Sequence, residues 1–134
     1  MIVADANIIL ARCLRSMRTE VANKIYLRDR IWIAPKLWQS EFVSALMKHQ
    51  REGKLDREVV DRALYFAESL MMGMDYDSDL HDVTAVTQRT KCSAYDSCYI
   101  ALAEEKGVKL ITTDGGILAN APHVAISPER FLAV

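Results

Sequence analysis

Short apolar runs alternate along the chain with longer segments in which apolar residues recur at helical spacing. Unbroken short apolar runs are typical of buried parallel strands, and they predict strands at 1–4, 31–34, 71–76, 108–112 and 124–126. Apolar residues three and four positions apart predict helices at 5–14, 19–28, 35–53, 56–70, around 83–86, 93–105 and 129–132. Strands and helices therefore take turns along the sequence.

Residues at the predicted boundaries agree with this division. Pro35 suits the first turn of a helix, because its missing N–H is no loss there, and Asp56 is a good N-cap. Gly107 is a typical helix end. The alternation predicts an α/β fold with a largely parallel central sheet and helices on both faces. In such folds the ligand site lies beyond the carboxyl ends of the strands.

The composition favours one folded domain, spanning residues 1–134, with 51% apolar and 26% charged residues. No apolar run approaches the roughly 20 residues that span a bilayer, and no signal-peptide pattern is present, so a soluble cytoplasmic protein is expected. Three cysteines without a C-x-x-C pair predict reduced thiols rather than disulfides or a zinc site. The net charge of −1 means that any nucleic-acid partner must be held locally.

Four acidic residues are predicted to meet at the carboxyl edge of the sheet. Asp5 directly follows the first strand, and Asp114 follows the strand at 108–112. Glu41 lies in the first turns of the helix that leaves the second strand. Asp96 begins the helix that runs antiparallel to the strand at 108–112, so this position also faces the carboxyl edge. Acids from four distant segments are therefore expected to share one rim.

Converging carboxylates repel one another unless a cation lies among them. Oxygen ligands without histidine or thiolate select Mg²⁺ or Mn²⁺ over zinc. One or two such ions activate water and stabilise the leaving oxygen in phosphodiester cleavage. The four acids thus predict hydrolase chemistry without a covalent nucleophile.

Each acid also has an ordinary explanation as a local structural residue. Asp5 can cap the helix that follows it, and Ser93 with Asp96 forms a capping box. Asp114-Gly115-Gly116 is a good turn sequence, and Glu41 suits the positive end of its helix. None of these explanations requires the four acids to face one cleft, and their predicted common location favours the metal site.

The order and spacing of these residues resemble PIN-domain nucleases, particularly the VapC-type toxins of prokaryotic toxin–antitoxin pairs. The resemblance runs through nearly the whole chain. Its carriers are Ile2-Val3-Ala4-Asp5-Ala6-Asn7, Ser40-Glu41-Phe42, the stretch from Ser93 to Ala103, and Leu110-Ile111-Thr112-Thr113-Asp114. One departure is Gly115-Gly116, where similar proteins carry a bulkier polar or charged pair.

The resemblance implies a PIN-like three-layer α/β/α sandwich. It also implies a set of metal-binding residues, namely Asp5, Glu41, Asp96 and Asp114. Asn7 and Thr113 match polar supporting positions, which orient metal ligands rather than bind the ion. The resemblance further implies cleavage of single-stranded RNA, a homodimer, and inhibition by a small antitoxin protein.

Basic residues near these segments are candidates for RNA contacts. Arg12, Arg15 and Arg18 recur every three residues, a spacing that predicts one side of the chain near the acidic rim. A solvated helix face or an antitoxin-binding patch explains these arginines at least as well. The same alternatives apply to a second basic group, Lys48, Arg51, Lys54 and Arg57.

The leading hypothesis is an endoribonuclease in which Asp5, Glu41 and Asp96 hold Mg²⁺, or Mn²⁺ in its place. Asp114 completes this site or forms a second, weaker one. The alternative is a PIN-like module without catalytic activity that binds RNA or protein, against which the presence of all four acids argues. A phosphatase or phosphoacceptor domain is disfavoured, because Asp5-Ala6-Asn7 lacks the second aspartate of the common phosphatase signature.

Overall fold

The computed structural model describes residues 1–53 and 55–133, so Lys54 of the second basic group lies outside the described residues. The strands are β1 (Ile2–Ala4), β2 (Trp32–Pro35), β3 (Asp75–Tyr76), β4 (Leu110–Ile111) and β5 (Ala125–Ile126). The helices are α1 (Ala6–Cys13), α2 (Thr19–Arg28), α3 (Trp38–Gly53), α4 (Arg57–Met71), α5 (Leu80–Thr90), α6 (Ala94–Lys106), α7 (Gly115–Asn120) and α8 (Pro128–Ala133).

The strands form one sheet in the order β3-β2-β1-β4-β5, and every described strand pair is parallel. Val3 of the central strand lies opposite Ile33 on one side and Leu110 on the other. Because all strands point the same way, their carboxyl ends meet at one edge of the sheet. The predicted α/β fold with a largely parallel sheet is confirmed.

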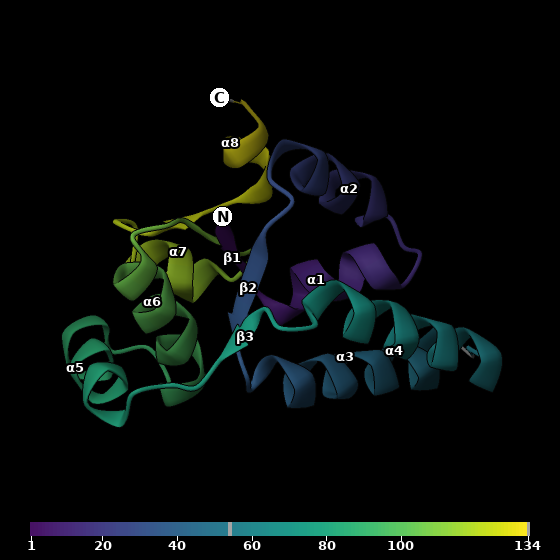
Figure 1. The fold of residues 1–134 in the computed structure, drawn as a ribbon, viewed down its shortest axis with the longest axis horizontal. Coiled ribbons are helices and arrows are strands. Elements are labelled where there is room, and N and C mark those ends of the chain that lie inside the picture. Colours follow the sequence, from purple (N-terminus) through teal and green to yellow (C-terminus); the bar gives the residue numbers. More distant parts are fainter. Residues whose placement is uncertain (54, 134) are drawn as a thin grey trace.

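Two groups of helices flank the sheet (Figure 1). On one side α1 packs against α2, α3 and α4. On the other side α6 packs against β1, β2 and β4, and α5 packs against α6. This arrangement confirms the three-layer α/β/α sandwich, and it places the starts of α1, α3 and α6 near the carboxyl edge.

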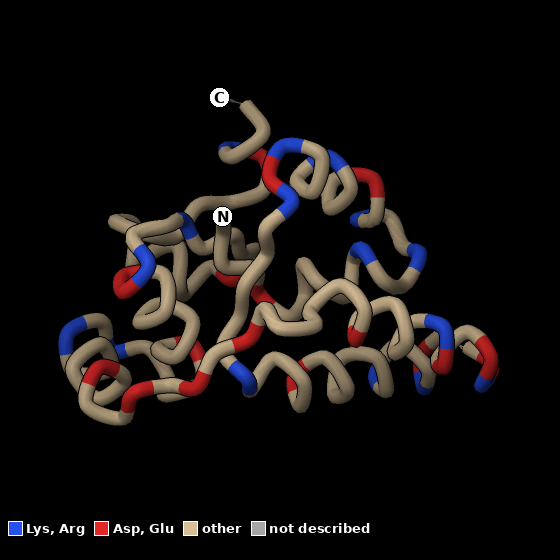
Figure 2. The backbone as a smooth tube through the Cα atoms, viewed as in Figure 1, with Lys and Arg blue, Asp and Glu red and all other residues tan. Residues whose placement is uncertain are grey.

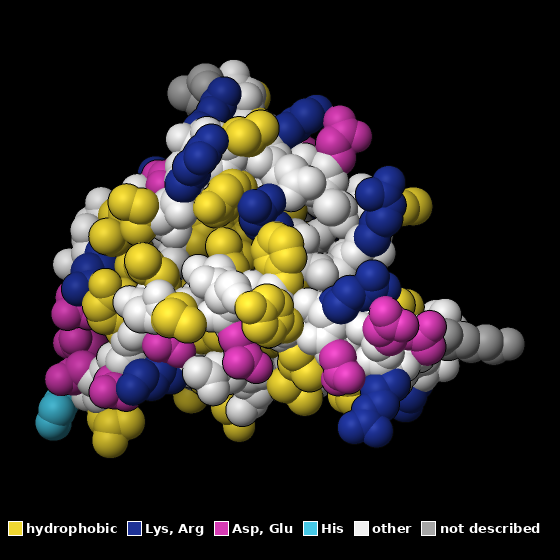
Figure 3. Space-filling view, turned by 45° about the vertical axis from the view of Figure 1, so that its right-hand side comes forward, with side chains coloured by type: hydrophobic (Ala, Val, Ile, Leu, Met, Phe, Trp, Pro, Cys, Tyr) yellow, Lys and Arg dark blue, Asp and Glu magenta, His cyan; other side chains and the backbone are white. Residues whose placement is uncertain are grey.

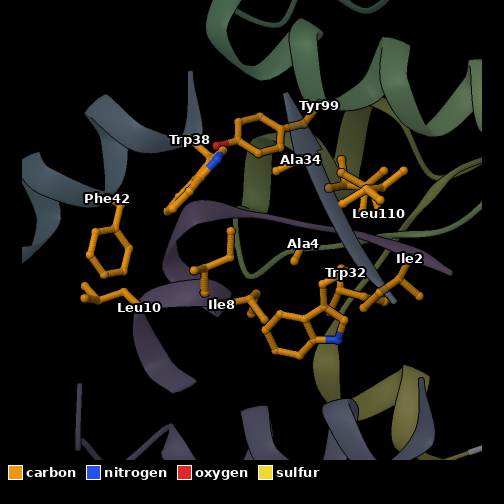
Figure 4. Packing of buried hydrophobic residues seen from close by; sticks show 14 of the residues in the cluster. Ile2, Ala4, Ile8, Leu10, Trp32, Ala34, Trp38, Phe42, Tyr99 and Leu110 are labelled. Atoms are coloured by element: carbon orange, nitrogen blue, oxygen red, sulfur yellow. The ribbon is translucent and has the colours of Figure 1, made fainter. Parts of the chain in front are cut away.

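The core forms where these layers meet, and all residues of β1, β2 and β4 are buried (Figure 4). Val3, Ile33, Leu110 and Ile111 are all completely buried, and burying one such side chain stabilises the fold by about 1.5–3 kcal/mol. This rigid packing fixes the backbone immediately before Asp5 and close to Asp114.

Predictions at several element boundaries are wrong. Pro35, expected in the first turn of a helix, is the last residue of β2, and α3 begins at Trp38. Met71, expected to begin a strand, ends α4, and β3 spans only Asp75–Tyr76.

A short helix, α7, occupies the segment where Asp114-Gly115-Gly116 predicts a turn. Two glycines disfavour helix formation, because they lose the most backbone entropy. The Asp114 side chain offsets this cost by accepting a hydrogen bond from the N–H of Ile117 at 2.8 Å. Ile117 is buried, which anchors the helix to the core.

The remaining global features concern cysteines and membranes. Cys13, Cys92 and Cys98 are free thiols, and Cys92 is the buried one. No helix in the described part of the chain has both the length and the apolar character needed to cross a bilayer.

Candidate metal centre

The four predicted acids line one cleft of ≈ 550 Å³ at the carboxyl edge of the sheet. Asp5 follows β1, Asp114 lies three residues beyond β4, and Glu41 and Asp96 lie in the first turns of α3 and α6. The other side chains lining the cleft are mostly small or polar, and they include Asn7, Ser40, Ser44, Lys48, Tyr95 and Tyr99. The predicted convergence of the acids is therefore present in the structure.

Asp5 is held by both of its carboxylate oxygens. Oδ1 accepts a hydrogen bond from the N–H of Asn7 at 3.2 Å, which caps α1. Oδ2 accepts a hydrogen bond from the hydroxyl of Thr112 at 2.6 Å. The capping explanation and the cleft position are thus compatible, because capping orients the carboxylate at the edge of the sheet.

Thr112 links the ends of β1 and β4. While its hydroxyl donates to Asp5, the same oxygen accepts a hydrogen bond from the N–H of Asp114 at 3.0 Å. Thr112 is completely buried, so water does not compete for these bonds. One hydroxyl group therefore fixes two of the four acidic residues relative to each other.

Glu41 and Asp96 are held from helix α6. The hydroxyl of Tyr99 donates a hydrogen bond to Oε1 of Glu41 at 2.6 Å. The N–H of Asp96 donates to the hydroxyl oxygen of Ser93 at 3.1 Å, which caps α6. The predicted role of Ser93 as a cap is present, and the helix start brings Asp96 to the cleft.

Asp5, Glu41 and Asp96 hold protons more tightly than free side chains do. Burial is the largest cause of the raised pKa values of Asp5, Glu41 and Asp96. Negative neighbours add to it: Asp114 raises the pKa of Asp5 and of Asp96, and Asp5 raises that of Glu41. Hydrogen bonds from Thr112 and Tyr99 act in the opposite direction on Asp5 and Glu41. The site as a whole repels further negative charge.

No lysine, arginine or histidine of the described residues forms an ion pair with any of the four acids. Many of the basic residues lie instead on α2, on the segment between α1 and α2, and at the far ends of α3 and α4 (Figure 2). No ion pair among the described residues therefore neutralises the cleft acids.

This donor set fits a hard divalent cation, because it offers carboxylate oxygens and no thiolate or imidazole. Across residues 1–53 and 55–133, no three acidic, histidine or cysteine side chains already stand as a closed set of metal ligands. Holding an ion therefore requires the carboxylate side chains to turn toward one another. Asp5, Glu41, Asp96 and Asp114 are the residues that would hold Mg²⁺ or Mn²⁺.

Asn7 and Thr113, the two polar residues that the resemblance places beside the metal ligands, lie in different surroundings. Asn7 lies at the cleft and contributes its backbone N–H to Asp5. Thr113 is exposed and lines a neighbouring apolar groove, while the adjacent Thr112 makes the hydrogen bonds that hold Asp5 and Asp114. The supporting hydroxyl in the structure is therefore that of Thr112.

The three arginines are not brought together at the acidic cleft. The guanidinium of Arg12 stacks on the ring of Tyr26 at 3.8 Å and donates to Asn23 at 2.5 Å. Arg15 is exposed, and Arg18 forms an ion pair with Glu129 at 3.0 Å. Helix α1 ends at Cys13, so the spacing of three does not continue along one helix face. Among the described basic residues, Lys48 is the one that lines the cleft.

Thr112 and Tyr99 are site residues that the sequence reasoning did not single out. Each has a recognisable signal. Thr112 stands two residues before Asp114, the spacing at which a hydroxyl accepts a backbone N–H in a turn. Tyr99 stands three residues after Asp96, which places both on neighbouring positions of one helix face.

Known proteins resemble this chain along nearly its whole length. The profile of the PIN domain family matches residues 2–123. The protein named Ribonuclease VapC3, from Pyrobaculum aerophilum, is 29% identical over 125 residues, which cover 90% of this chain and 95% of that protein. The crystal structure of PAE2754 from Pyrobaculum aerophilum matches with a TM-score of 0.71 and 23% identity, covering 98% of this chain and 93% of the other. This last similarity concerns the fold.

Proposed function

The chain belongs to the PIN domain family, and from this premise we propose that it is a Mg²⁺-dependent endoribonuclease. Mn²⁺ is the expected substitute ion. The name of its relative, Ribonuclease VapC3, supports RNA as the substrate class. The proposal places the protein in the cytoplasm, together with its RNA substrates.

The observation that carries the proposal is the unneutralised acidic cleft. Four carboxylates from four distant segments line it, and no cation of the described residues pairs with them. Burying and crowding such groups costs free energy, as the raised pKa values of Asp5, Glu41 and Asp96 indicate. A structure that maintains this arrangement is suited to binding a cation from solution.

The chemistry follows from how the residues hold their oxygens. When bound, Mg²⁺ supplies a Lewis acid that activates water and offsets negative charge on the phosphate. Asp5 and Asp114 are locked together through Thr112, and Glu41 is held by Tyr99. No serine, cysteine or histidine is needed as a nucleophile, because water attacks the phosphodiester. One ion, or two with Asp114 at the second, fits this set of ligands.

The cleft also provides groups for the RNA itself. Lys48 lies on α3 seven residues after Glu41, and its ammonium group is suited to a phosphate next to the scissile bond. Tyr95 directly precedes Asp96 and is 67% exposed, so its ring is available to stack on an unpaired base. These two residues support the preference for single-stranded RNA.

Two other functions fit the cleft less well. A binding module without activity has no need of four unpaired acids at one edge, whereas a nuclease requires them. A phosphoacceptor role for Asp5 is disfavoured, because Asp5-Ala6-Asn7 lacks the second aspartate of the common phosphatase signature.

The proposal is tested with purified protein and end-labelled RNA. Cleavage is expected with Mg²⁺ or Mn²⁺ and not with EDTA, and Asp96→Asn is expected to abolish it. Attack by water leaves a phosphate on one product, with no 2′,3′-cyclic intermediate, so mass spectrometry of the ends identifies the nucleophile. Cleavage that persists in EDTA, or that Asp96→Asn retains at the wild-type rate, would contradict the proposal.

We further propose that a small antitoxin protein inhibits this ribonuclease. A largely apolar groove of ≈ 370 Å³ borders the cleft and shares Asn7 with it. Its lining includes Ile8, Leu14, Val21 and Arg18, residues that suit an amphipathic segment of a partner. Co-expression with the product of the neighbouring short reading frame should yield a stable complex without cleavage activity.

A homodimer is also proposed. The chain exposes large apolar side chains, including Leu27 (68% exposed), Tyr65 (76%) and Met72 (77%). One face of the molecule carries apolar side chains among charged ones (Figure 3). Such side chains are more favourably placed in an interface than in water. Light scattering of the purified protein should give twice the mass of one chain.

A further inference from the structure

The side chain of Tyr99 is shared between the core and the acidic cleft. Tyr99 is only 2% exposed, and its ring packs within the hydrophobic cluster. Figure 4 shows the ring reaching from α6 toward α3, the helix that carries Trp38 and Phe42. Its hydroxyl meets Oε1 of Glu41 at 2.6 Å. A buried, well-packed ring thus delivers one hydrogen-bond donor to one oxygen of a cleft acid.

This contact restricts Glu41 more than the helix alone can. A glutamate side chain has three rotatable bonds, and fixing them costs conformational entropy. Tyr99 has two rotatable bonds, both fixed by core packing. A short hydrogen bond to a carboxylate is roughly twice as strong as one between neutral groups. The bond occupies Oε1, and it leaves Oε2 without a described partner in the protein.

Helix α6 therefore acts on the cleft in two ways. It contributes Asp96 directly, and three residues later it contributes the hydroxyl that holds Glu41 of helix α3. Side chains three residues apart are neighbours on a helix surface, so a single rigid element sets the relative position of two acids.

We propose that Tyr99 is a positioning residue, whose hydroxyl anchors Oε1 of Glu41 so that Oε2 is presented to the divalent ion. This inference rests on the proposed metal-dependent function. It assigns Tyr99 no direct contact with the ion or with RNA.

The test is a calorimetric titration of Mn²⁺ into metal-free protein, which requires no activity. Tyr99→Phe removes one oxygen atom and keeps the packed ring. Loss of a residue that orients a metal ligand typically weakens metal binding by about 10–100-fold, and at least a 10-fold rise in Kd is expected. Tyr65→Phe is the matched control, because it removes an exposed hydroxyl on α4, away from the cleft, and the Kd should not change.

A double-mutant cycle separates positioning from a general structural effect. In the Glu41→Gln background the Tyr99 hydroxyl no longer positions a metal-binding carboxylate. Adding Tyr99→Phe there should therefore alter the Kd for Mn²⁺ by less than about twofold. An equal weakening in both backgrounds would overturn the inference, as would a wild-type Kd in Tyr99→Phe alone. If wild-type protein binds no Mn²⁺, the proposed function itself fails.

A second measurement applies even if Tyr99→Phe folds poorly. Fluorotyrosine incorporated into otherwise wild-type protein gives a separate ¹⁹F signal for Tyr99, assigned by elimination when each of the other four tyrosines is replaced in turn. Mg²⁺ should shift this signal saturably in wild-type protein, and should not shift it in Glu41→Gln. An unchanged ¹⁹F signal at saturating Mg²⁺ would contradict the proposal that Tyr99 holds Glu41 while Glu41 binds the ion.

Discussion

The two ends of helix α6 place carboxylates in opposite environments. At its start, Asp96 shares the cleft with three other acids, and burial raises its pKa. At its end, Glu104 accepts hydrogen bonds from Arg89 at 3.0 and 2.9 Å, and it contacts Nε2 of His123 at 2.6 Å. Arg89 is the main cause of the lowered pKa of Glu104.

The difference separates a structural acid from one suited to binding an external ion. Glu104 has its cations within the protein, and its pairing joins α5, α6 and the segment before β5. The acids at the carboxyl edge have hydrogen-bond donors that orient them, but no described cation that neutralises them. Removing one charge at each end of α6 should therefore have opposite consequences.

The largest expected effect is on RNA cleavage. Asp96→Asn should lower the Mg²⁺-dependent rate by at least about 100-fold, because losing about 3 kcal/mol of transition-state stabilisation gives that factor. Glu104→Gln removes the same charge from the same helix and should leave the rate unchanged. Single-turnover rates of the two variants, each checked for folding by circular dichroism, make the comparison. Similar losses of cleavage rate in both variants would contradict the difference between the two ends of α6.

The next effect is stabilisation by the ion. At a Mg²⁺ concentration 100 times the Kd, binding to the native state adds about 2.7 kcal/mol to the free energy of unfolding. Thermal melts should show this rise for wild-type protein and for Glu104→Gln. Asp5→Asn should show little or none. A rise of equal size in Asp5→Asn would place the ion elsewhere.

Removing the Thr112 hydroxyl has a smaller effect, a loss of about 1–3 kcal/mol in the free energy of unfolding. Thr112→Val keeps the shape of the side chain but removes the hydroxyl between Asp5 and the N–H of Asp114. We expect a loss of stability and a weaker affinity for Mg²⁺, and Thr112→Ser should restore both. Urea unfolding with and without Mg²⁺ measures the two contributions, and a neutral Thr112→Val would show that the hydroxyl link is dispensable.

The smallest effect is on the pH dependence of stability in EDTA. Asp5, Glu41 and Asp96 have pKa values above the ordinary 3.8 and 4.5, so the folded protein binds their protons more tightly than the unfolded chain. The stability that they contribute is full below these ordinary values, and it is lost as the pH rises through their folded-state pKa values. Glu104 is opposite, because its stabilisation is present above 4.5 and is lost as the pH falls through its lowered pKa.

Melting temperatures of metal-free protein between about pH 3 and pH 8 test these signs. Asp96→Asn should reduce the loss of stability that accompanies rising pH. Glu104→Gln should reduce the loss that accompanies falling pH. If both variants change the same side of the profile, the two ends of α6 do not differ as described.

Much of the fold and all four cleft acids were predictable, because each rests on topology rather than on side-chain detail. A residue that follows a parallel strand lies at the carboxyl edge whatever its neighbours are, which places Asp5 and Asp114. The same rule places the early turns of α3 and α6, with Glu41 and Asp96, at that edge. Helix α7 was missed because an aspartate cap and one buried isoleucine outweigh the two glycines.

The supporting groups and the basic residues were less predictable, since they depend on side-chain direction. The choice between Thr112 and Thr113 is decided by the pleat at the end of β4, which buries one and exposes the other. Arg15 and Arg18 lie beyond the last residue of α1, where regular spacing no longer defines a common face. A period of three in the sequence is informative only within a continuous helix.

The central claim is that Asp5, Glu41, Asp96 and Asp114 hold one divalent site together. A crystal structure of the protein grown with Mn²⁺, with anomalous data, tests it most directly. The account predicts the strongest anomalous peak within the cleft, at roughly 2 Å from carboxylate oxygens of at least three of these four residues. No peak in the cleft at saturating Mn²⁺, or a stronger one bound by other residues, would contradict it.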